Sequence, residues 1–131
     1  MNEEIGRRWV AALRSGDYKQ GVGRLRAHRG DDGVKYCCLG VLTDLWVQDA
    51  GQHWTEEGVP SSQSGVYGGV WLSPEVQAWS GMSNESGRLS RCVYTAGRAA
   101  ESLAEANDST TFDFSAIADI IEYQFLGVGN V

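Results

Sequence analysis

Apolar residues recur at helical spacing at the start of the chain. Ile5, Trp9 and Leu13 fall on one helical face, with Asn2 placed to cap the first turn and Gly16 placed to end the last one. Two acidic residues follow the cap, at the positive end of the helix dipole. We therefore predict a helix between Asn2 and Gly16, with the apolar face in the core.

A second strong helical pattern lies near the end of the chain. Asp113 is a suitable N-cap, Phe112 before it can pack onto Ile117, and Gly127 stands after the last periodic residue. The apolar face predicted for this helix consists of Phe114, Ile117, Ala118, Ile121 and Phe125. This segment is predicted to form the last helix of the fold.

Two further helices are predicted between these ends. A short strand over Val34–Cys37 leads into a helix that ends before Gly51, and its apolar face is formed by Cys38, Val41, Leu42, Leu45 and Trp46. Ser73-Pro74 is typical of an N-cap followed by proline in the first helical position, and Gly81 ends the short helix that follows.

The remaining segments have weaker patterns. Residues 17–35 are rich in turn residues and have room for one short strand, residues 51–69 form a long loop, and residues 82–90 form another. Short strands are predicted at 70–72 and 91–94, and a short helix containing Ala99, Ala100 and Leu103 runs out at Asn107-Asp108. The fold class expected is α+β, with about five helices packed around a small, mostly antiparallel sheet in a single globular domain, residues 1–131.

Composition narrows the class of protein. A chain of 131 residues with 42% hydrophobic residues can bury a conventional core, which excludes wholesale disorder. No apolar stretch approaches the ~20 residues that span a bilayer, and the acidic start does not resemble a signal peptide. Three cysteines, two of them adjacent, favour a reducing compartment over disulfides. We expect a cytoplasmic protein with no membrane partner.

The charge is unevenly distributed. The net charge of -6 argues against a protein that binds duplex nucleic acid through a phosphate-neutralising face. Residues 1–36 nevertheless hold eight Lys or Arg against five acids, whereas residues 37–87 hold six acids and no Lys or Arg. The basic groups in the first quarter of the chain are therefore the candidates for holding an anion.

A ligand site is predicted among these basic groups. An extended backbone places Arg24 and Arg26 on the same side, with Lys35 and the aromatic Tyr36 close by in sequence. Together these residues suit an anionic, stackable ligand such as a nucleotide, although two arginines on a solvated strand are the alternative. The aromatic residues Trp54, Tyr67 and Trp71 beside the long loop suit either recognition or packing over the sheet.

Other candidate chemistry is weaker. Asn107 and Asp108, between two helices, suit either a helix-ending turn or a ligand contact. Cys37 and Cys38 lie near a predicted helix N-terminus, which favours a thiolate, but an apolar helix face favours simple burial. No zinc-binding spacing of Cys and His is present, so no metal site is predicted. No other cofactor and no catalytic residue is assigned either.

Several short motifs carry a resemblance. They are Trp9-x-x-x-Leu13-Arg14-Ser15-Gly16-x-Tyr18-x-Gln20, the block Tyr36-Cys37-Cys38-Leu39-Gly40-Val41-Leu42-x-Asp44-Leu45, Trp54, Val76-x-x-Trp79-x-Gly81, Asn107-Asp108-x-x-x-x-Phe112, and Ile117-Ala118-Asp119-Ile120-Ile121-Glu122. In these motifs the chain resembles a widespread group of small bacteriophage and prophage proteins. The resemblance implies a phage origin and expression in the cytoplasm of a bacterial host.

Three functions follow as hypotheses from the basic segment and the resemblance. The first is a phage accessory protein that sequesters a small nucleotide-derived host signal, with a pocket between subunits of a homo-oligomer as one arrangement. The second is an inhibitor of a host defence or nucleic-acid enzyme that binds this host protein through the acidic segment. The third is a small hydrolase of such a signal, centred on Cys37 or an aspartate.

Overall fold

The fold is α+β, as predicted. The computed structural model describes residues 1–28, 30–65, 68–95, 97–109 and 111–127. Within them the α-helices are α1 (Glu3–Arg14), α2 (Cys38–Asp49), α3 (Pro74–Ser80), α4 (Leu103–Asp108) and α5 (Phe114–Gln124). The strands are β1 (Arg26–His28), β2 (Val34–Tyr36), β3 (Arg88–Thr95) and β4 (Arg98–Ser102), and two 3-10 helices cover Gly30–Asp32 and Ser61–Gln63.

Three helices begin at the caps that the sequence predicts. The side chain of Asn2 accepts from the backbone N–H of Ile5 at 3.0 Å, and the side chain of Asp113 accepts from that of Ala116 at 2.9 Å. Ser73 caps α3 in the same way. These caps satisfy N–H groups that have no partner inside the helix, which explains why local sequence places the helix starts correctly.

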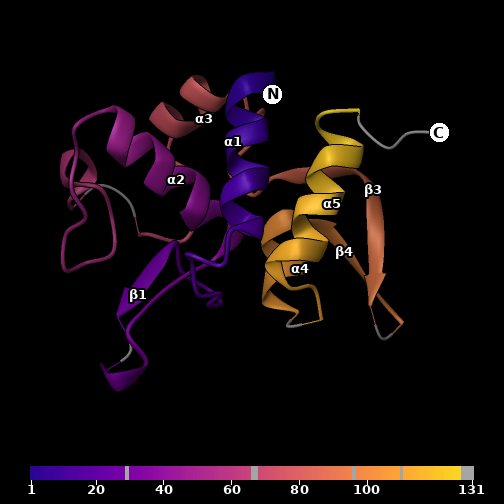
Figure 1. Cartoon of the computed structure of the whole chain (residues 1–131), viewed down its shortest axis with the longest axis horizontal. Helices are drawn as coiled ribbons and strands as arrows, with labels where there is room; N and C mark the ends of the chain where they lie inside the picture. Colours follow the sequence, from indigo (N-terminus) through magenta and orange to yellow (C-terminus); the bar gives the residue numbers. More distant parts are fainter. Residues whose placement is uncertain (29, 66–67, 96, 110, 128–131) are drawn as a thin grey trace.

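The four strands form two separate antiparallel pairs rather than one small sheet (Figure 1). In the first pair Arg26 lies opposite Tyr36, Ala27 opposite Lys35 and His28 opposite Val34. In the second pair β3 and β4 run antiparallel with Tyr94 opposite Ala99, and their register shifts between Arg88 and Val93. In Figure 1, β1 is at the lower left and β3 at the right, with α1, α4 and α5 between them and α2 and α3 at the upper left.

Three of the weaker predictions are wrong. Residues 70–72 form no strand, and the backbone N–H of Leu72 donates instead to the carbonyl of Glu85 at 3.0 Å. Ala99 and Ala100 lie in β4 rather than in a helix, because α4 starts only after its N-cap Ser102. Pairing with β3 overrides the helix propensity of alanine here. β3 also begins at Arg88, inside the segment predicted as a loop.

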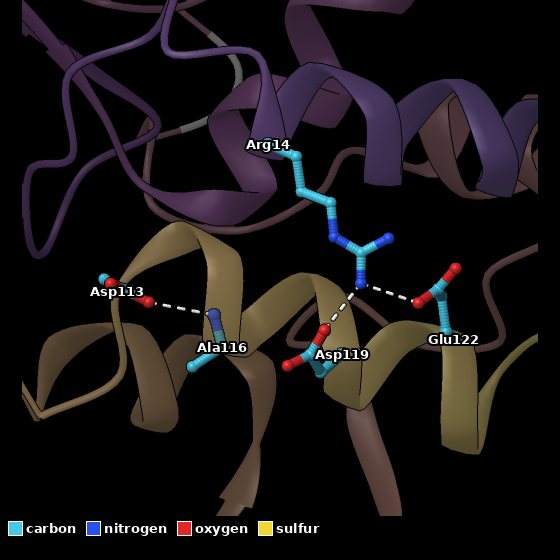
Figure 2. A network of polar contacts seen from close by, with 5 residues as sticks. All are labelled: Arg14, Asp113, Ala116, Asp119 and Glu122. Atoms are coloured by element: carbon cyan, nitrogen blue, oxygen red, sulfur yellow. Dashed lines mark hydrogen bonds and ion pairs between the residues drawn. The ribbon is translucent and has the colours of Figure 1, made fainter. Parts of the chain in front are cut away.

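Helix α1 occupies the centre of the molecule and packs against α5 and α2 (Figure 1). Trp9 of α1 is fully buried, and its indole N–H donates to the carbonyl of Cys38 at 2.9 Å. At the surface, Figure 2 shows the Arg14 guanidinium between Asp119 and Glu122 of α5. The first and last helices are thus joined in one hydrophobic core.

Candidate functional site

A cleft of about 720 Å³ lies between β1 and the loop that follows α2. Its size is within the range of pockets that bind small molecules. The residues that line it are Arg24, Arg26, Ala27, His28, Trp54, Thr55, Glu56, Glu57 and Gly58. Basic, acidic and aromatic side chains therefore share one concave surface.

The loop that forms one part of the cleft is a tight hairpin. Trp54 pairs with Pro60 in an isolated bridge, and the N–H of Thr55 donates to the carbonyl of Val59 at 2.9 Å. Gly58 has a φ of +78°, and a Cβ at this position would lie 2.5 Å from the carbonyl oxygen of Arg26. Glycine is required because the loop meets the backbone of β1 this closely.

The Arg26 side chain contacts two aromatic rings. Its guanidinium carbon lies 5.9 Å from the ring centre of Tyr36 and 5.7 Å from that of Trp54, and its Nε donates to the Tyr36 hydroxyl at 3.2 Å. Both ring distances are within the range of cation–π attraction. The guanidinium is therefore held in place at the cleft before any ligand arrives, which lowers the entropy cost of binding.

Asp44 of α2 holds the Trp54 ring directly and supports the Tyr36 ring through Tyr18. The indole N–H of Trp54 donates to Asp44 at 2.8 Å, and the hydroxyl of Tyr18 donates to the same carboxylate. Tyr18 also meets Tyr36 edge to face, with ring centres 5.0 Å apart. Burial, followed by the bond to Asp44, raises the pKa of Tyr18 well above its ordinary value, so this hydroxyl stays a donor.

Arg24 is more exposed and ties the cleft to a second loop. Its Nη2 donates to the carbonyl of Glu57 at 2.9 Å and to that of Gly68 at 3.4 Å. A guanidinium has five N–H donors, so these two bonds leave donors of Arg24 for an anion. Glu57 in turn accepts from the hydroxyl of Ser64 at 2.7 Å.

The structure brings together only some of the residues predicted for the ligand site. Arg24 and Arg26 line the cleft, and Tyr36 lies against Arg26. Lys35 pairs with Ala27 in the two-stranded sheet of β1 and β2, at the position next to the Arg26–Tyr36 pair. Because side chains alternate along a strand, Lys35 lies on the opposite face of this two-stranded sheet from Arg26.

Asn107 and Asp108 lie apart from the cleft and have structural contacts. The fully buried amide of Asn107 accepts from the N–H of Cys38 at 3.1 Å and donates to the carbonyl of Gly21 at 2.8 Å. Asp108 accepts from the N–H of Gly23 at 3.0 Å and borders a different hollow, of about 450 Å³, which includes the exposed Trp71. Neither residue lines the cleft.

Several residues that line the cleft are not predicted by the sequence to bind a ligand. Glu56, Glu57 and His28 have no local pattern that distinguishes them from other loop and strand residues. Trp54 was noted only as an aromatic residue beside the long loop, and its link to Asp44 spans ten residues. Tyr67, which the sequence analysis groups with Trp54 beside the long loop, lies outside the described residues.

The paired cysteines are poor nucleophiles. Cys37 and Cys38 are both buried free thiols. Burial raises the pKa of Cys37 from 9.0 to about 11, and burial likewise raises the pKa of Cys38. Neutral thiols without access to solvent do not attack a substrate, so this geometry disfavours the hydrolase hypothesis in its cysteine form. Among the described residues, no three His, Cys, Asp or Glu side chains gather as metal ligands would.

The described residues form a small α+β fold with a cleft of mixed charge that contains an aromatic ring. The chain belongs to a family described as a domain of unknown function (DUF8296), whose model matches residues 1–125. Neither curated proteins nor solved structures yield a match. In the described part of the chain, no helix is long and apolar enough to cross a bilayer.

Proposed function

We propose that this protein binds a small anionic molecule with a flat ring, of the nucleotide class, in the cleft around Arg26 and Trp54. The observation that carries the proposal is the Arg26 guanidinium, fixed over two aromatic rings at the wall of the cleft. Guanidinium planes and indole rings both stack on nucleobases. The N–H groups of Arg24 complement the oxygens of a phosphate.

The biological role that we propose is sequestration. A phage-encoded accessory protein would withhold a nucleotide-derived signal from host enzymes in the cytoplasm of the infected bacterium. The resemblance to phage proteins supports this role, and the protonated, buried thiols of Cys37 and Cys38 favour binding over thiol-based hydrolysis. A homo-oligomer with a pocket between its subunits stays a prediction.

Calorimetric titration of the full chain tests the proposal. The ligand panel is ADP, ADP-ribose and cyclic dinucleotides, and we expect saturable heat with at least one of them. Arg26→Ala should weaken that binding about tenfold or more, because a charge-assisted contact and a stacking surface are both lost. Arg26→Lys should weaken it as well, since an ammonium keeps the charge but has no plane to stack.

The matched control is Arg91→Ala, which removes an exposed arginine on β3 outside the cleft and should leave the affinity unchanged. Circular dichroism establishes that each variant is folded. The proposal is overturned if no nucleotide in the panel gives heat or a thermal shift with the wild-type chain, or if the two variants of Arg26 bind as tightly as the wild type.

A second candidate function rests on the charge of residues 37–87, which hold six acids and no Lys or Arg. Such a segment is suited to cover a basic surface on a host nuclease or polymerase, since charge complementarity steers association. Affinity purification from host lysate separates the two candidates, because a protein-directed inhibitor retains a partner in equal amount and a nucleotide sponge does not.

A further inference from the structure

Strand β4 has one edge that no other strand covers. Among the described residues it pairs with β3 alone, and it contacts α4 on its other side (Figure 1). The N–H of Glu101 donates to the Glu105 side chain of α4 at 3.4 Å, so this N–H points away from β3. N–H groups two residues apart in a strand point the same way, so the N–H and the carbonyl of Ala99 also face the uncovered edge. Neither group has a hydrogen-bond partner among the described residues.

The hollow of about 450 Å³ beside Trp71 runs along this edge. Arg98, Ala99 and Ala100 line it one after another, and no described residue of β3 does. Consecutive side chains of a strand point to opposite faces, so a hollow lined by three in a row lies along the edge of the strand. Ala104 of α4 lies in the same lining. The hollow is therefore a groove between the edge of β4 and α4.

An extended peptide is the occupant whose chemistry fits this groove. Its backbone can pair with the N–H and the carbonyl of Ala99, which is how a strand adds to the open edge of a sheet. The small side chains of Ala100 and Ala104 leave room for an apolar side chain of the peptide. The exposed indole of Trp71 provides a surface for that side chain to pack against.

The charges of the groove favour a basic peptide. Glu105 and Asp108 are exposed carboxylates in its lining, and Arg98 is the one cation there among the described residues. Gly23 and Asn107 both donate to Oδ1 of Asp108, and no described residue donates to its Oδ2. Lysine or arginine beside the apolar residue of the peptide would complement these carboxylates.

We propose that the groove between β4 and α4 binds a short extended segment of a partner protein, which adds to β4 as a strand. The segment has apolar side chains on the side that faces the groove, flanked by basic ones. This surface is separate from the cleft around Arg26, so the inference goes beyond the proposed function and does not rest on it.

Fluorescence anisotropy with a labelled peptide tests this inference. The peptide Lys-Thr-Val-Thr-Leu-Thr-Lys, amidated and labelled at its N-terminus, places both lysines, the valine and the leucine on one side when it is extended. We expect saturable binding to the full chain. Replacing both lysines of the peptide by glutamate should weaken binding about tenfold or more, because carboxylates then face Glu105 and Asp108.

Methylation of backbone nitrogens tests the pairing itself. Alternate N–H groups of an added strand face β4 and the solvent. Methylating the threonines should therefore change the affinity differently from methylating the valine and leucine. One of the two peptides should bind about tenfold more weakly than the unmethylated peptide, since it loses hydrogen bonds to the edge, and the other should stay within about twofold.

Trp71→Ala should weaken binding about fivefold or more, because it removes the surface on which the apolar side chain packs. The matched control is Tyr94→Ala, which removes an exposed ring of β3 outside the groove and should leave the affinity unchanged. Circular dichroism establishes that both variants are folded.

Three results overturn the inference: no saturable binding of the basic peptide, equal binding of the two methylated peptides, or a Trp71→Ala variant that binds like the wild type. Light scattering adds a fourth, since a dimer that Trp71→Ala dissociates would assign the groove to a second copy of the chain. None of these results changes the nucleotide titrations, because none involves Arg24 or Arg26.

Discussion

At the scale of single residues, the buried amide of Asn107 joins segments that are far apart in the sequence. It accepts from Gln20 at 3.0 Å and from the N–H of Cys38, and it donates to the carbonyl of Gly21. The sequence indicated a turn residue or a ligand contact, because an Asn-Asp pair at a helix end commonly satisfies its own backbone. Only tertiary contacts decided that this amide holds the start of α2 against residues 20–21.

We expect Asn107→Ala to lower the free energy of unfolding by about 3 kcal/mol, since it leaves the buried N–H of Cys38 and the half-buried carbonyl of Gly21 without the partner that they have in the folded protein. Urea denaturation followed by circular dichroism measures the change. Asn2→Ala, which removes only the N-cap of α1, should cost about 1 kcal/mol. If Asn107→Ala costs no more than the loss of that cap, the amide is not the structural link described here.

At the scale of elements, helices and strands differ in how far the sequence predicts them. Helices α1, α3 and α5 carry their own caps and apolar faces, and their starts are predicted correctly. The segment that forms β4 is predicted as part of a helix, because alanine favours helices locally. It is a strand because its backbone pairs with β3. The cleft has the same origin, since β1 and residues 54–58 meet only in the folded molecule.

The close approach of α2 to Leu25 gives a prediction for the helix itself. A Cβ at Gly40 would lie 1.7 Å from the carbonyl oxygen of Leu25. In an isolated helix Gly→Ala stabilises by about 1 kcal/mol, but Gly40→Ala should instead destabilise the protein by about 2–3 kcal/mol or prevent folding, because backbone must move.

Thermal and urea unfolding of Gly40→Ala measure this effect. Gly68→Ala is the matched control, since a Cβ at Gly68 meets nothing within 4 Å, and it should unfold close to the wild type. A Gly40→Ala protein as stable as the wild type would contradict this account of the helix packing.

At the scale of the whole molecule, one hydrophobic core contains residues from α1, α2, α3, α4 and α5. The thiols of Cys37 and Cys38 lie inside it, so global unfolding exposes both of them to water at once. Because burial raises the pKa of Cys37 to about 11 in the folded state, the folded chain holds this proton to higher pH than the unfolded chain does.

The sign of the pH effect follows directly. The stability linked to the neutral Cys37 thiol is fully present below pH 9 and is lost as the pH rises through about 11. We expect Cys37→Ala to reduce the fall in unfolding free energy between pH 9 and pH 11 by about 2 kcal/mol. Urea titrations across this range provide the measurement.

The contact between the Cys92 thiol and the Tyr94 hydroxyl raises the pKa of Tyr94, so the control is Cys92→Ala in a Tyr94→Phe background. Cys92 is an exposed thiol, and its removal there should leave the alkaline fall unchanged. An alkaline fall that is identical in the wild type and in Cys37→Ala would show that the thiol does not contribute to it.

The sequence by itself determined the class of fold, the positions of the capped helices and the burial of their apolar faces. These features depend on contacts within a few residues, such as a cap bonding three positions ahead, which the order of residues specifies directly. Tertiary structure alone decided three features. They are the pairing of β3 with β4, the burial and hydrogen bonds of Asn107, and the aromatic rings that contact Arg26. Asn107 and Arg26 depend on partners between 10 and 87 residues away, whose meeting is fixed only when the whole core has formed.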